Sequence, residues 1–206
     1  MRNLRNIFFV GIAMVILISC GKSYTPEQQI YVDELEKYRQ ESDDYMENNA
    51  NSPFNNKGKV DFHPLNYFEP NFDFIFRSKL TEYPQKDTVI VFGTKGEERK
   101  TVRYGYLEIN YKHEVQRINV YESSSQNGQI YYSLWFTDNT TNKETYGVGR
   151  YLHFNLMNDP NYEYIIDFNY VFNPYCAYSK DYSCAIPRKE DHLNIAIEAG
   201  EKKFHD

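Results

Sequence analysis

Eight short segments rich in aromatic and β-branched residues constrain the fold of this chain more than any other feature. They are residues 72–77, 88–92, 102–111, 115–121, 130–137, 150–156, 164–172 and 192–199. In several of them apolar and polar residues alternate, as in strands with one buried face. The 20 tyrosines and 14 phenylalanines suit packing across strands. The pattern predicts a mainly β fold, an antiparallel sheet curled into a sandwich or partial barrel, with one hairpin turning near Lys112 and His113.

One helix is predicted before the first strand. Thr25 can cap it, Pro26 suits the first turn, and Gln28 completes a capping box with Thr25. An apolar stripe then follows at helical spacing, formed by Tyr31, Leu35, Tyr38 and Tyr45. The segment 48–53 ends the helix. We expect this N-terminal α-helix to cover a face or an edge of the sheet, rather than to bind a partner.

Residues 1–19 have the features of an export signal. Arg2 and Arg5 precede the apolar run 7–18, which is too short to span a bilayer comfortably. The ending Leu-Ile-Ser-Cys resembles the bacterial lipoprotein box, whose cysteine, here Cys20, is acylated with lipid such as palmitate and becomes the first mature residue. The alternative is an uncleaved N-terminal membrane anchor.

A lipidated Cys20 would place the protein in the cell envelope. Residues 20–24 would be a short tether and residues 25–206 a single domain. We expect a lipid-anchored protein of the outer membrane that faces the periplasm, with the bilayer as its partner. Without residues 1–19 the chain keeps 21 basic and 29 acidic side chains, a net charge of −8. That balance argues against binding to nucleic acid or to an anionic membrane surface, because both favour basic patches.

Within residues 139–187, glycines, charged residues at inward positions and two cysteines interrupt the strand pattern. Such departures collect at functional sites, so this stretch is the candidate functional region. Gly147 and Gly149 suggest a bulge or a close backbone approach, and they lack the spacing of a dinucleotide-binding loop. Arg150 follows them and shares its parity with apolar residues, so it is predicted to point inward. A buried arginine needs an anionic partner.

Asp167 is the partner predicted for Arg150, with Asn169 completing the hydrogen bonds. Asp167 and Asn169 are two residues apart, and therefore on one face of a strand. Two interpretations remain open. The pair is either a structural ion pair that fixes strand register or part of a pocket for a small polar ligand. Glu201 near the C-terminus could join this network, or it could lie at a solvated strand end.

Cys176 and Cys184 enclose a short loop and are predicted to form a disulfide in an oxidising compartment. A zinc site is disfavoured, because the five histidines are scattered and close ligand pairs are missing. We therefore predict no metal and no cofactor. A nucleophilic Cys176 with His192 as its base is a weaker alternative.

Several motifs from residue 137 to residue 202 resemble one family, the domain of unknown function 1684. They are D-N-T-T-N-K-E-T-Y-G-V-G-R-Y, D-F-N-Y-V-F-N-P-Y-C-A-Y, the second cysteine with a nearby I-P, and I-E-A-G-E-K. The resemblance implies that eleven residues lie at the family's motif positions: Glu144, Tyr146, Gly149, Arg150, Asp167, Asn169, Asn173, Cys176, Tyr178, Cys184 and Glu201. It implies no activity, since the family is named for lacking one.

Two functions are consistent with these features. The first is a binding or structural module of the cell envelope, with any small polar ligand near Arg150. The alternative is a hydrolase-like enzyme with a buried carboxylate, from Glu144, Asp167 or Glu201, as general base. A hydrolase would need a cleft that joins at least two of these residues, whereas a structural module would bury them in closed pairs.

Overall fold

The computed structural model describes residues 23–125 and 127–205. Its folded part consists of one long helix, α1 (Pro26–Asn48), and two β-sheets. The predicted signal segment and Cys20 lie outside the described residues. Within the described ranges, no helix combines the length and apolarity needed to cross a bilayer.

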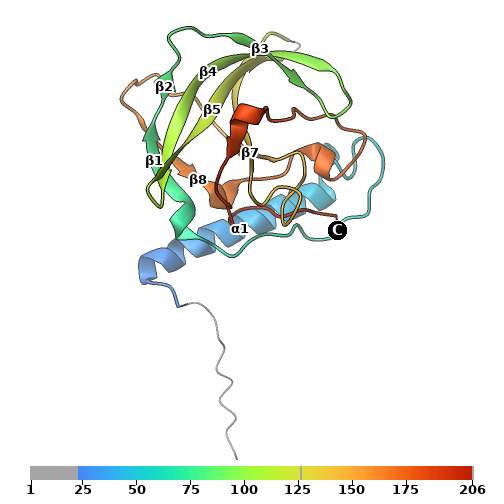
Figure 1. The fold of residues 1–206 in the computed structure, drawn as a ribbon. Helices are drawn as coiled ribbons and strands as arrows, with labels where there is room; N and C mark the ends of the chain where they lie inside the picture. The colour runs from blue at the N-terminus through green and yellow to red at the C-terminus, as the bar shows by residue number, and fades with distance from the viewer. Residues whose placement is uncertain (1–22, 126, 206) are drawn as a thin grey trace, which may run out of the picture.

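The larger sheet contains seven strands. They are β2 (Thr81–Glu82), β3 (Thr88–Phe92), β4 (Glu98–Tyr111), β5 (Glu114–Ser124), β6 (Ile130–Asp138), β7 (Arg150–His153) and β9 (His192–Leu193). The strand order is β2-β4-β5-β6-β7, with β3 also paired to β4 and β9 paired to β6. All of these pairs are antiparallel except β6 with β9. The sheet curls on itself, and α1 lies across one end of it (Figure 1).

The smaller sheet pairs β1 (Ile75–Lys79) with β8 (Glu163–Asp167) in antiparallel register. Short 3-10 helices flank the strands at Phe72–Phe74, Phe168–Tyr170, Tyr175–Ala177 and Lys189–Asp191. The main core lies between the two sheets, where Phe74 and Phe168 pack against apolar residues of β4, β5 and β6. The predicted fold class is confirmed: the chain is mainly β and antiparallel, with a curled sheet and one N-terminal helix.

Helix α1 begins as its sequence predicts. The hydroxyl of Thr25 accepts from the backbone of Gln28, and the Gln28 side chain accepts from the backbone of Thr25. Leu35 is fully buried, while Tyr31 and Tyr38 pack edge-on against Tyr170. The capping box and the aromatic stripe therefore fix both the start of the helix and its docking face.

Irregular backbone shapes the sheet at two points. The hairpin between β4 and β5 turns at Lys112 and His113, as predicted. Both residues have positive φ. The β4–β5 register shifts between Arg103 and Gly105, which divides the long strand into two halves. A Cβ on Gly105 would lie 2.6 Å from the carbonyl oxygen of Thr81, so only glycine allows β2 to approach here.

The predicted strand 192–199 is wrong after Leu193, although burial still alternates along the segment. The carbonyls of Ile197 and Ala199 accept hydrogen bonds from the Arg150 side chain. A side chain thus takes the place that a neighbouring strand would occupy. The alternating pattern predicts the buried face correctly, but it carries no information on which groups the backbone bonds to.

Candidate functional site

Arg150 begins β7 and is almost completely buried, with 1 % of its surface exposed. Its Nη2 donates to Asp138 Oδ2 at 2.7 Å and to the Ile197 carbonyl at 2.8 Å. Its Nη1 donates to the carbonyls of Ala199 at 2.5 Å and Glu201 at 3.2 Å. We call these five residues the Arg150 cluster. Burial lowers the pKa of Arg150, and the neighbouring Asp138 carboxylate opposes that shift. The Asp138 carboxylate balances the positive charge of the guanidinium, and both Nη atoms already donate to groups within the protein.

The predicted partner of Arg150 is therefore wrong, because Asp138 takes the place assigned to Asp167. The reason is topological: β7 pairs with β6, which ends at Asp138, whereas Asp167 lies on β8 in the other sheet. Asp138 has the same parity as Leu134 and Phe136, which are buried. That parity is the signal that could have identified Asp138 as an inward carboxylate.

Gly149 allows Arg150 to enter the core. Its φ is +97°, a left-handed conformation that glycine adopts without strain. A Cβ at this position would lie 2.3 Å from the carbonyl oxygen of Phe136. The close backbone approach predicted from the paired glycines is confirmed at Gly149.

Asp167 and Asn169 form a second group, which ties α1 and a loop to the end of β8. Asp167 Oδ2 accepts from the Tyr31 hydroxyl at 2.8 Å, and Oδ1 accepts from the backbone N and Nδ2 of Asn169, both at 2.9 Å. Asn169 also exchanges hydrogen bonds with the backbone of Asn71 at 2.8 and 2.9 Å. These contacts join α1, the Asn71 loop and the end of β8. Both carboxylate oxygens of Asp167 already accept hydrogen bonds within the protein.

Glu201 belongs to a third group with Asn173 and Tyr178. Its carboxylate accepts from the Asn173 backbone at 2.9 Å, from Asn173 Nδ2 at 2.8 Å and from the Tyr178 hydroxyl at 2.5 Å. Burial raises the pKa of Glu201 to about 7, although these hydrogen bonds favour the ionised form. Glu201 is thus buried and satisfied, and it titrates near neutral pH.

The remaining predicted site residues do not join these groups. Glu144 is exposed, and the Tyr146 hydroxyl donates to the carbonyl of Cys176 at 3.0 Å. Burial raises the pKa of Tyr146. The candidate network is therefore divided: Asp167 and Asn169 lie apart from Arg150, whereas Glu201 joins the Arg150 cluster through its carbonyl. Of the three carboxylates proposed for a hydrolase, no two line the same one of the five cavities described here.

The predicted disulfide is absent, because Cys176 and Cys184 are free thiols. The Cys184 sulfur accepts a hydrogen bond from the Cys176 backbone at 3.1 Å. A further hydrogen bond with Cys184 lowers the pKa of the Cys176 thiol to about 7. The two sulfurs interact as hydrogen-bonded thiols rather than as a covalent link.

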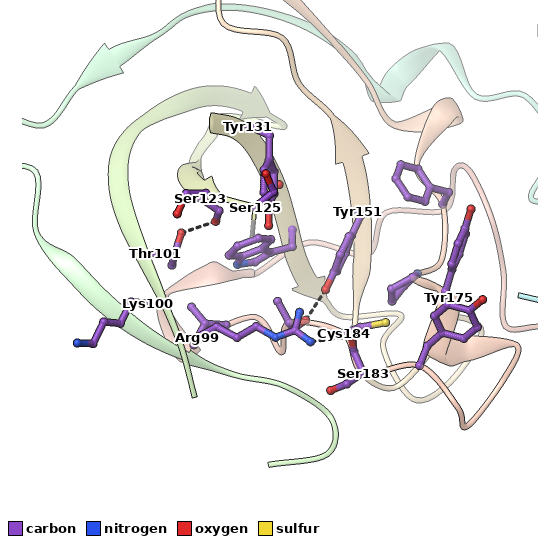
Figure 2. Close-up of a pocket in the computed structure, with 18 residues that line it drawn as sticks. Arg99, Lys100, Thr101, Ser123, Ser125, Tyr131, Tyr151, Tyr175, Ser183 and Cys184 are labelled. Atoms are coloured by element: carbon purple, nitrogen blue, oxygen red, sulfur yellow. Dashed lines mark hydrogen bonds between the residues drawn. The ribbon is translucent and has the colours of Figure 1, made fainter. Parts of the chain in front are cut away.

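A cavity of about 690 Å³ opens on the face of β6 and β7 that is opposite to Arg150. We call it the Trp135 cavity. It is lined by Val91, Arg99, Lys100, Thr101, Ser123, Ser124, Ser125, Tyr131, Ser133, Trp135, Tyr151, Phe172, Pro174, Tyr175, Tyr182, Ser183, Cys184 and Ala185. Figure 2 shows Thr101 and Ser123 on one side and Tyr151 and Tyr175 on the other. The lining therefore combines hydroxyl groups with aromatic rings.

Trp135 is 4 % exposed, and its indole nitrogen has no hydrogen-bond acceptor among the described residues. Its ring stacks on Tyr121, with centroids 4.6 Å apart and planes 13° apart. Tyr121 is held in turn by its hydroxyl, which donates to buried Asp191 at 2.8 Å. The tryptophan is therefore fixed in position with an unused donor. Its strand position hinted at this role, since Trp135 has the opposite parity to core residues Leu134 and Phe136.

The cavity has a basic rim but no free guanidinium. Arg99 contacts the Glu97 carboxylate and donates to the Ser183 carbonyl at 2.8 Å. Thr101 and Ser123 share a hydrogen bond of 2.8 Å, whereas no bond to another described residue is found for the Ser133 hydroxyl. Aromatic walls with a few placed polar groups are typical of small-molecule sites. This arrangement can bind and orient a molecule that carries hydroxyl and acceptor groups.

Comparison with known proteins gives a family and a fold. The model of a family described as "Protein of unknown function (DUF1684)" matches residues 60–202. Among solved structures, an uncharacterized protein from Haloarcula marismortui, determined by solution NMR, is similar with a TM-score of 0.61 and 24 % identity. The match covers 85 % of this chain and 96 % of that one, and at this identity it supports the fold alone. No match was found among curated proteins.

Proposed function

We propose, from the premise that this chain belongs to DUF1684, a family of proteins of unknown function, that it is a binding module for a small polar ligand held in the Trp135 cavity. The single observation that carries this proposal is the lining of this cavity of about 690 Å³, which sets tyrosine and tryptophan rings beside serine and threonine hydroxyls. Rings supply apolar contact area and hydroxyls supply hydrogen bonds, a combination typical of small-molecule sites.

The lining favours a neutral molecule with several hydroxyl groups. Serine and threonine hydroxyls can donate and accept, while tyrosine and tryptophan faces pack against apolar C–H surfaces. Of the two lining cations, Arg99 is already paired with Glu97, so the positive charge open to an anionic ligand is limited to exposed Lys100. Saccharides combine hydroxyl groups with an apolar face, and N-acetylated sugars add a carbonyl acceptor.

The proposal includes a place in the cell envelope. It rests on the basic start, the apolar run and the Leu-Ile-Ser-Cys ending of residues 1–20. Cys20 would carry the lipid and hold the domain close to the membrane. Replacing Cys20 with serine should move the protein from the membrane fraction to the soluble fraction, and continued membrane retention of C20S would contradict the anchor.

Tryptophan fluorescence offers a direct test, because Trp135 is the only tryptophan in the chain. Full-length protein would be titrated with N-acetylglucosamine and its β-1,4-linked dimer, with glucose and cellobiose as partners that lack the acetamido carbonyl. We expect a saturable change in emission that is larger and tighter for the N-acetylated sugars. An unchanged spectrum for all four saccharides at millimolar concentrations would contradict the proposal.

Serine variants separate binding from scaffolding without removing the fluorophore. Ser133→Ala should weaken binding by roughly three- to tenfold, since it removes one hydroxyl from the cavity wall. Ser78→Ala, on β1 and outside the cavity, is the matched control and should leave binding unchanged. Equal effects of the two substitutions would assign the response to the fold rather than to the cavity.

A further inference from the structure

A second cavity, of about 320 Å³, lies between α1 and the segments that carry Glu201 and Tyr175. We call it the Glu201 cavity. Its lining consists of Tyr38, Glu41, Ser42, Tyr45, Met46, Leu65, Tyr67, His153, Val171, Phe172, Tyr175 and Glu201. It differs from the Trp135 cavity in chemistry, because it has a single serine and two carboxylates.

Five of its twelve lining residues are tyrosine or phenylalanine. Tyr38 and Tyr45 come from α1, Tyr67 from the loop before β1, and Phe172 and Tyr175 from the segment after β8. The hydroxyls of Tyr45 and Tyr175 lie 3.2 Å apart, so the helix and the opposite wall meet at this point. Several ring faces around one small space can contact an organic cation, since the face of each ring carries negative charge.

The charges of the lining have one sign. Glu41 is exposed on α1, Glu201 is buried, and none of the lining residues is lysine or arginine. Desolvation lowers the pKa of His153, so this side chain is neutral at pH 7. Arg39 on the helix is not a lining residue, but its guanidinium lies 4.5 Å from the centre of the Tyr67 ring and covers one face of it. Arg39 is held there by Glu36 at 3.0 Å and by the Phe68 carbonyl at 2.9 Å.

We propose that the Glu201 cavity binds a small organic cation of the alkylammonium class. Methyl groups on the nitrogen would contact the tyrosine and phenylalanine rings, while the charge is attracted by the ring faces and by Glu41 and Glu201. The Glu201 oxygens already accept three hydrogen bonds, so Glu201 acts through its charge rather than as a direct ligand.

Binding should be coupled to the ionisation of Glu201. The groups that face this carboxyl are Tyr38 on α1, Tyr67 in the loop, Tyr178 after β8 and Arg150 on β7. All three tyrosines have raised pKa values and stay neutral at pH 7, and Arg150 is neutralised by Asp138. Because a cation favours the ionised carboxylate, its affinity should increase as the pH rises through about 7, where Glu201 titrates.

Calorimetric titration of the full-length protein with choline tests this proposal against 3,3-dimethylbutan-1-ol, which has the same shape without the charge. We expect choline to bind at least roughly tenfold more tightly than the neutral alcohol, and more tightly at pH 8 than at pH 6. Equal affinity for the two compounds, or no heat from choline, would overturn the proposal. This comparison uses the unaltered protein and does not depend on the folding of any variant.

A matched pair of variants locates the site. Tyr45→Leu removes one ring from the Glu201 cavity at a position that is 37 % exposed, and it should weaken choline binding by roughly three- to tenfold. Tyr131→Leu, which is 48 % exposed and lines the Trp135 cavity, should leave choline affinity unchanged. Loss of choline binding with Tyr131→Leu but not with Tyr45→Leu would overturn the assignment. The saccharide response of Trp135 is independent of this outcome.

Discussion

Arg150 and Tyr151 are consecutive residues of β7, yet their side chains enter two different polar environments. Arg150 faces Phe136 across the β6–β7 pair and donates every bond to groups of the Arg150 cluster. Tyr151 faces Trp135 across the same pair and lines an open cavity. The buried charge thus belongs to a closed structural centre on one face, whereas the other face borders the cavity where we propose that a ligand binds.

The difference shows which polar features indicate function. In the buried ion pair, both Nη atoms of Arg150 and both carboxylate oxygens of Asp138 already have partners within the protein, so these groups are not free for a ligand. Trp135 has no acceptor among the described residues, and it lies beside a space large enough for a small molecule. The open cavity with its aromatic and hydroxyl lining is therefore the feature on which our binding proposal rests.

The largest effect should follow from breaking the Arg150 cluster. Arg150→Met leaves Asp138 buried without its charge partner and should lower the free energy of unfolding by about 3–5 kcal/mol. Urea unfolding measures this loss. Arg77→Met is the matched control, because Arg77 pairs with Glu163 at 3.4 Å on the surface, and it should cost less than about 1 kcal/mol. Similar losses for the two variants would show that the buried Arg150–Asp138 pair matters no more to stability than the exposed Arg77–Glu163 pair.

An intermediate effect should appear in the pH dependence of stability. Burial raises the pKa of Glu201 from 4.5 to about 7, so the folded state binds a proton that the unfolded state has released between those values. The free energy of unfolding should therefore fall as the pH rises from about 4.5 to about 7, by roughly 3 kcal/mol from this group.

Glu201→Gln should flatten that slope, since glutamine does not titrate. Buried Asp191, whose pKa is also raised by burial, will retain part of the slope in both proteins. The informative quantity is thus the difference between the two pH profiles from urea unfolding. Parallel profiles would show that Glu201 has the same pKa in the folded and unfolded chains.

The smallest effect should come from the contact between α1 and β8. Tyr31→Phe removes the hydrogen bond to Asp167 but leaves the donors from Asn169, so the loss in unfolding free energy should be about 1 kcal/mol. The fluorescence response of Trp135 to saccharides should be unchanged. A loss of that response would move the binding site back toward Asp167 and weaken the distinction between the two faces of β6 and β7.

The secondary structure was predictable to the extent that it depends on local pattern. The capping box at Thr25 and Gln28 fixed the helix start, and the turn at Lys112 and His113 fixed one hairpin. The partner of Arg150 was not predictable from those features, because it depends on which strand pairs with β7. The Trp135 cavity also depends on the packing of distant loops, such as the segment that carries Cys184.

The contacts of Arg150 with the carbonyls of Ile197, Ala199 and Glu201 have a consequence for folding. They join residues that are 47 to 51 positions apart in the sequence, so the cluster closes a long loop when it forms. The entropy lost in closing such a loop is offset only once the buried contacts are complete. We therefore expect this cluster to form late in folding, after the local hairpins.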